Sequence, residues 1–97
     1  MPEQSALANL RQFEWDPTES VSYEVAIEAI SQAAAAITPL IAAARQQDND
    51  AAVAELINLR KQCIAARNEL RPTDHQAVAA TTQHYRALAE QLRWRAA

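Results

Sequence analysis

The sequence predicts an all-α protein, an antiparallel three-helix bundle with an additional short N-terminal helix. Three observations lead to this prediction. The chain of 97 residues contains no glycine, which excludes most of the tight turns that join β-strands. Alanine is abundant and β-branched residues are few, a composition that favours helices. Apolar residues also recur at alternating steps of three and four along three long segments, which turn-forming residues separate.

The first sixteen residues are predicted to be an N-terminal arm or short helix, followed by a helical bundle domain over residues 17–97. Ser5 is a candidate N-cap for a helix that extends to Trp15. Isolated helices shorter than about 12 to 15 residues are marginal in water. We therefore expect this segment to dock on another surface through its apolar residues Leu7, Leu10 and Phe13.

The next helix begins after a cluster of helix-start signals. Asp16 is a candidate N-cap, Pro17 suits the first turn and Glu19 is the capping-box acid, while Ser20 is a competing N-cap one turn later. The helix is therefore predicted to start between residues 17 and 21 and to reach residue 47. Its apolar stripe comprises Tyr23, Ile27, Ile30, Ala34, Ile37, Ile41 and Ala44, widened by Ala26, Ala33 and Leu40.

Two further features shape this part of the chain. Pro39 has no N–H group and its ring meets the carbonyl of Ala35, so we expect either a kink over residues 35–39 or a break at Pro39. Residues 48–50 predict a short turn, with Asn49 able to take the left-handed conformation and Asp50 able to cap the following helix. So short a turn requires an antiparallel neighbour.

Two more helices complete the predicted bundle. The first runs to about Leu70, and Pro72 ends the turn after it. Thr73 and Gln76 form a capping box for the last helix. The stripe of the former is Ala52, Leu56, Leu59, Cys63, Ala66 and Leu70, flanked by Val53, Ile57 and Ile64; that of the latter is Val78, Thr81, Tyr85, Leu88 and Leu92.

No pattern in the sequence indicates catalysis, a metal site or a cofactor. The single cysteine, Cys63, lies on a core stripe and has no Cys-x-x-Cys companion, so we expect it to be a buried core residue. His75 and His84 lack a partner at the four-residue spacing of a helical metal site. We therefore expect a protein that is not an enzyme and binds no cofactor.

The chain also lacks the marks of secretion or membrane insertion. Its longest nearly apolar run, residues 33–44, contains Thr38 and Pro39 and is shorter than the roughly 20 residues that a membrane helix needs. The N-terminus has no apolar region of the kind found in signal peptides. We expect a cytoplasmic protein that does not bind a membrane.

Charge is distributed unevenly along the chain. Residues 1–50 carry two basic and eight acidic side chains, a balance of −6, whereas residues 51–97 carry seven basic and four acidic ones, a balance of +3. Charges that complement helix dipoles are one explanation. The other is an acidic edge that faces a basic pocket of a partner, which makes nucleic acid a poor partner. The acids concerned are Glu14, Asp16, Glu19, Glu24 and Glu28.

Three of the five aromatic residues, Phe13, Trp15 and Tyr23, fall within eleven residues at this acidic junction. Two interpretations remain open, because aromatic side chains dominate cores and interfaces alike. The first segment either folds back so that its aromatics cover the bundle, or docks on a partner with Phe13 and Trp15 as anchors and the acids as a polar rim.

The helical pattern resembles the small helical antitoxins that bacteria encode beside zeta-type toxins. The resemblance spans about residues 20–93 and rests on helical patterning, with no unique motif. The residues that carry it are Ser22, Tyr23, Glu24, Ala26, Ala42 to Arg45, Glu55, Leu56, Arg60, Arg67, Glu69 to Asp74, Tyr85 and Leu88.

This resemblance implies a three-helix antitoxin that catalyses nothing itself. It binds a cognate toxin, a kinase of the P-loop type that phosphorylates a UDP-linked amino sugar, and covers its nucleotide site with a helix. The blocking helix corresponds to residues 23–30 here, while residues 1–16 have no counterpart. The partner-binding residues expected on both grounds together are Phe13, Trp15, Tyr23, Glu24, Ile27 and Glu28.

Two alternatives belong to other classes of protein. A thin, alanine-rich core and wide apolar stripes are consistent with a self-associating bundle that acts as a structural or adaptor protein. A small helical enzyme of the chorismate-mutase kind would bind a dicarboxylate through Arg60, Arg67 and Arg71, although these lie off the core stripe.

Overall fold

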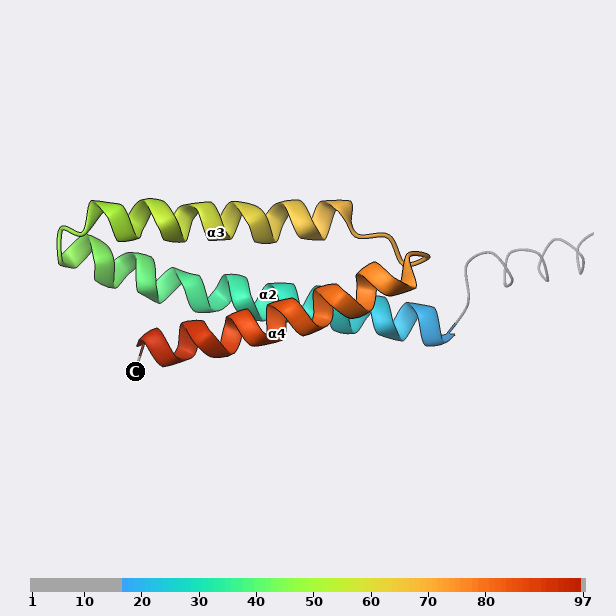
Figure 1. The fold of residues 1–97 in the computed structure, drawn as a ribbon. Helices are drawn as coiled ribbons and strands as arrows, with labels where there is room; N and C mark the ends of the chain where they lie inside the picture. Colours follow the sequence, from blue (N-terminus) through green and yellow to red (C-terminus); the bar gives the residue numbers. More distant parts are fainter. Residues whose placement is uncertain (1–16, 97) are drawn as a thin grey trace, which may run out of the picture.

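The computed structural model describes residues 17–96, which form three α-helices and no strand. They are α2 (Pro17–Gln46), α3 (Asp50–Glu69) and α4 (His75–Ala96). Each helix runs antiparallel to the one before it, and all three lie along a common axis (Figure 1). The predicted all-helical fold is confirmed, including the start of α2 within residues 17–21. The additional helix predicted in residues 1–16 lies outside the described residues.

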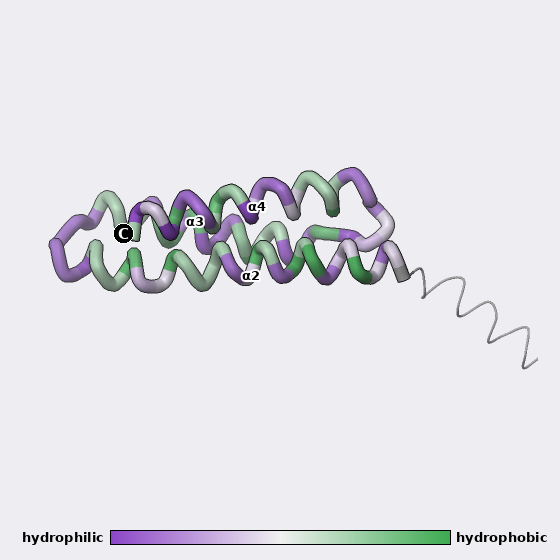
Figure 2. Tube along the Cα trace, turned by 90° about the horizontal axis from the view of Figure 1, so that it is seen from below, coloured by the Kyte–Doolittle hydropathy of each residue, from purple (hydrophilic) through white to green (hydrophobic). Residues whose placement is uncertain are grey.

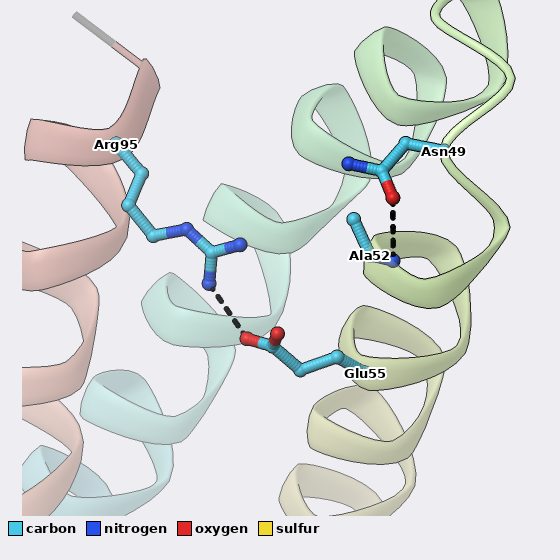
Figure 3. Close-up of polar contacts among 4 residues, drawn as sticks. All are labelled: Asn49, Ala52, Glu55 and Arg95. Carbon is cyan, nitrogen blue, oxygen red and sulfur yellow. Dashed lines mark hydrogen bonds and ion pairs between the residues drawn. The ribbon is translucent and has the colours of Figure 1, made fainter.

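The central element is α2, since both other helices pack along it. Ala26 and Ala33 are fully buried, and such small side chains let neighbouring helices approach closely. Figure 2 shows apolar positions recurring along α2, whereas α4 alternates between polar and apolar turns. By contrast, α3 and α4 meet mainly through long side chains. The Tyr85 hydroxyl donates to the carbonyl of Gln62 at 3.4 Å, and Arg95 pairs with Glu55 at 3.0 Å (Figure 3).

The core forms two clusters of buried side chains. The larger one runs along most of α2 and includes Ile37, Leu56 and Leu92, each at most 1% exposed. The smaller one joins Ala26, Leu70 and Val78 near the start of α2, with Tyr23, Ile27 and Ala77 packed against it. The predicted stripes therefore face the interior. The prediction for one flanking residue was wrong, because Ile64 points away from α2 and is 54% exposed.

Both turns differ from the prediction by one residue. Asp48, not Asn49, takes the left-handed conformation with φ of 53°. Asn49 is the N-cap of α3, where its side chain accepts a bond from the Ala52 N–H at 3.1 Å (Figure 3). At α4 the Asp74 carboxylate caps the Ala77 N–H at 3.1 Å, in place of Thr73. Asp, Asn and Thr side chains can all cap a helix N-terminus. Where several of them are neighbours in the sequence, the backbone conformation of the turn determines which one is the cap.

Pro39 does not break α2, which is continuous from Pro17 to Gln46. The prolyl ring removes the hydrogen bond to the carbonyl of Ala35. Both residues lie on the exposed side of the helix, so water can satisfy the carbonyl that the proline leaves free. The free-energy cost of the missing hydrogen bond is thereby reduced. Packing of the opposite face of α2 keeps the helix continuous on both sides of Pro39.

Among residues 17–96, Thr18–Gln46 is the one helical stretch long and apolar enough to cross a membrane. A helix that packs against two neighbours has the same length and composition. In this structure α2 buries one side against α3 and α4. The expectation that the chain does not bind a membrane stays a prediction.

We predict that Ile37→Ala lowers the free energy of unfolding by about 2–5 kcal/mol, because it leaves a cavity at the centre of α2. Ile64→Ala is the matched control, since its side chain lies on the surface, and it should change stability by less than about 0.5 kcal/mol. Urea unfolding followed by circular dichroism measures both. Equal losses in the two variants would contradict the assigned orientation of α2 and α3.

Candidate functional site

A hollow of the described surface lies between the first half of α2 and the first half of α4. Its volume is about 710 Å³, and no residue of α3 lines it. A second hollow of about 460 Å³ continues along α2 and shares Val21, Val25 and Arg86 with the first. We call the two together the α2–α4 groove. It is the side of the α2–α4 pair that α3 leaves uncovered.

The groove is apolar at its centre. Val21 is 58% exposed and Val25 is 36% exposed, although both belong to a helix whose other large aliphatic residues pack inward. Val78, which is buried, contributes to the lining from α4. Exposed aliphatic side chains that adjoin one another in a hollow are typical of a surface that another protein segment covers.

The acidic residues at the groove are arranged along α2, and Arg86 of α4 lines both hollows opposite them. At its start, Glu19 Oε2 lies 2.9 Å from His75 Nε2 and joins the first turns of α2 and α4. Further along, Glu24 and Glu28 line the second hollow, and the Glu28 carboxylate accepts a bond from the Gln32 amide at 3.2 Å. Within residues 17–96 neither Glu24 nor Glu28 forms an ion pair. Arg86 lines the same hollow, and the two carboxylates outnumber this one basic side chain there.

The structure separates the partner-binding residues that the sequence predicts. Glu24 and Glu28 line the groove, whereas Tyr23 and Ile27 are half-buried and pack against the smaller core cluster. Successive helical residues are rotated by about 100°, so the two pairs point to different sides of α2. Phe13 and Trp15 lie outside the described residues.

Sequence reasoning missed the two groove valines. Val21 and Val25 are four residues apart and lie outside the predicted apolar stripe of this helix. Residues with that spacing share a face of a helix. An apolar pair off the main stripe was the signal that could have revealed a second contact surface.

The groups considered for catalysis do not converge. Arg60, Arg67 and Arg71 are all exposed, and Arg71 lines a separate hollow between α3 and α4. Within residues 17–96 no group of His, Cys, Asp and Glu side chains could hold a metal ion. Cys63 is buried, as predicted.

No protein family, curated protein or solved structure matches this chain. The resemblance to zeta-type antitoxins therefore stays a hypothesis, and the described surface itself must carry the functional argument.

We predict that alkaline pH destabilises the fold through Cys63. Burial raises the pKa of the Cys63 thiol above its ordinary value of 9.0. Burial, and then the charge of the neighbouring Cys63, likewise raise the pKa of the Tyr85 hydroxyl above 10.0. The unfolded chain releases these protons first, so stability should fall as pH rises past 9.

Urea unfolding at pH 7 and at pH values from 9 to 10 measures this loss. In Cys63→Ala the loss should be smaller, because the thiol no longer contributes. An identical decline in both proteins over this range would contradict the assignment.

Proposed function

We propose that this chain is a non-enzymatic inhibitor protein that docks on a basic cleft of a partner through the first half of α2. The observation that supports the proposal is the exposed apolar pair Val21 and Val25 beside the unpaired carboxylates of Glu24 and Glu28. An apolar centre with a charged margin is the usual composition of a protein interface. Carboxylates at the margin select a positively charged surface.

Helix dipoles do not account for these carboxylates. Glu19 lies in the first turn of α2, where a negative charge is stabilised by the helix N-terminus. Glu24 and Glu28 lie beyond that turn, and the dipole effect falls off within it. This charge disfavours an acidic partner surface and favours a basic one, such as a pocket built to hold phosphate.

The antitoxin resemblance makes the proposal specific. The partner would be a cognate zeta-type toxin, a P-loop kinase in the bacterial cytoplasm, and α2 would cover its nucleotide-binding site. Glu24 and Glu28 would face the basic cleft, and Phe13 and Trp15 would add aromatic anchors. Tyr23 and Ile27 are half-buried, so their role would be to fix the orientation of α2 and to contact the toxin through their exposed edges.

A self-associating bundle is the second candidate, and the same groove favours it. An apolar hollow beside two helices can accept a helix from another copy of the chain. Light scattering distinguishes the two candidate functions, because a fully helical monomer at micromolar concentration would exclude the self-associating bundle.

The test is co-expression with the product of the adjacent gene. We expect the chain to form a complex with it and to relieve its growth inhibition. Glu24→Arg should weaken the complex at least about tenfold, because it places like charges opposite each other. Glu69→Arg is the matched control, an exposed acid on α3 outside the groove, and should leave the affinity unchanged. Absence of both complex and rescue would refute the antitoxin proposal.

A further inference from the structure

An exposed aliphatic side chain also lies on α3, within a ring of basic residues. Ile64 is 54% exposed, although it belongs to a helix that packs along α2. Residues three or four positions apart share a helix face. Those around Ile64 include three exposed bases, Arg60, Lys61 and Arg67. We call these four residues the α3 patch.

The charges of α3 are divided between two sides of the helix. Glu55 pairs with Arg95 of α4, and Glu69 lines the hollow between α3 and α4. Ile64 comes nine residues after Glu55, which is two and a half turns, so the α3 patch lies on the side opposite to Glu55. Neither of the ion pairs within residues 17–96 includes a base of the patch. The patch is therefore a positively charged surface with an apolar centre.

The α2–α4 groove has the complementary composition. Glu24 follows Val21 by three residues, and Glu28 follows Val25 by three, so each exposed valine shares a helix face with an acid. The two carboxylates outnumber Arg86 in this part of the groove. The groove thus combines an apolar centre with a surplus of negative charge, opposite in sign to the α3 patch.

The two surfaces also agree in length. Residues 21–28 of α2 and residues 60–67 of α3 each rise by about 10 Å at 1.5 Å per residue. A helix that lies along the groove can therefore bring its apolar centre over the valines and its bases over the acids at the same time.

We propose that the α3 patch of a second copy of this chain docks in the α2–α4 groove. Ile64 of the second copy then covers Val21 and Val25, and the bases around it face Glu24 and Glu28. Three exposed aliphatic side chains are thereby buried in one contact, which supplies the apolar part of the binding free energy. The charges supply the selection of this face of α3.

This contact does not close on itself. The groove is lined by α2, by α4 and by Pro72 before α4, so the groove and the α3 patch are separate surfaces. The copy that provides α3 still presents its own groove, and the copy that provides the groove still presents its own α3 patch. Such head-to-tail contacts continue to further copies. We therefore expect assemblies larger than a dimer at high concentration.

The inference rests on the self-associating bundle and is independent of the inhibitor proposal. The α3 patch has the same basic character as the cleft proposed for a partner, so one groove cannot hold both. Self-association is measured on the isolated chain, whereas inhibition is measured with the product of the adjacent gene. Either proposal can therefore fail while the other holds.

Sedimentation of the full chain tests the arrangement, at low salt and over about 5 to 500 µM, because a contact made by one helix is weak. The groove variant is Val21→Gln with Val25→Gln, and the patch variant is Ile64→Gln. Each should weaken self-association at least about tenfold, because a polar amide replaces the apolar centre. All three positions are exposed, so both variants should fold, which circular dichroism confirms.

Mixing the two variants distinguishes a head-to-tail contact from a symmetric one. Each variant retains the surface that the other lacks, so the mixture should form complexes of two chains and no larger. None of these substitutions changes the charge of the chain, so net charge cannot drive the pairing. The control is Ala80→Gln, at an exposed position on the hollow between α3 and α4, and it should associate like the unaltered chain.

Ionic strength tests the charge match. Raising NaCl from about 0.05 M to 0.5 M should weaken association of the unaltered chain about five- to tenfold, because exposed charges are screened. Association that does not depend on salt would overturn the proposal, as would an unaltered chain that stays monomeric at the highest concentration. Groove and patch variants that associate like the control, or that form no two-chain complex when mixed, would overturn it as well.

Discussion

The requirement that α2 bury apolar side chains against two neighbours at once governs this fold. Its 30 residues carry both core clusters, and α3 and α4 are placed by their contacts with it. Large residues such as Ile30, Ile37 and Ile41 fill the interior, while alanines between them are buried because the helices approach closely. Contacts between α3 and α4 are few and largely polar, so packing on α2 supplies most of the stability.

This arrangement explains why an apolar groove persists on the surface. The pair formed by α2 and α4 has two faces, and α3 covers only one of them. The opposite side exposes Val21 and Val25, whose burial would favour any helix that fits. The groove thus follows from having three helices, of which one covers a single side of the pair formed by the other two.

The acidic residues of α2 fall into two groups. Glu19 complements the N-terminus of α2 and contacts His75, while Arg95 at the end of α4 pairs with Glu55 of α3. These charges have structural partners. Glu24 and Glu28 line the open groove without ion pairs in the described part of the chain, and this contrast is the reason that we propose them as partner-binding residues.

The helices, their approximate ends and the buried stripes could all be predicted from the spacing of residues along the chain. Steps of three and four are a local property of helical geometry, which is why the spacing of Leu56, Cys63 and Leu92 was enough to assign them to the core. The cluster of acidic and aromatic residues around the start of α2 predicted a contact surface there, and this stays a prediction. Turn residues were located to within one position, since Asp, Asn and Thr compete for the same caps.

Which face of each helix stays exposed could not be predicted in this way, because it depends on how the helices pack. The pattern of α2 could not tell that Tyr23 and Ile27 would be covered by Leu70 and Val78 while Val25 remained exposed, because coverage depends on where α3 and α4 pass. The continuity of α2 through Pro39 was decided in the same way. A local pattern specifies what a helix can bury, whereas the positions of its neighbours determine what it does bury.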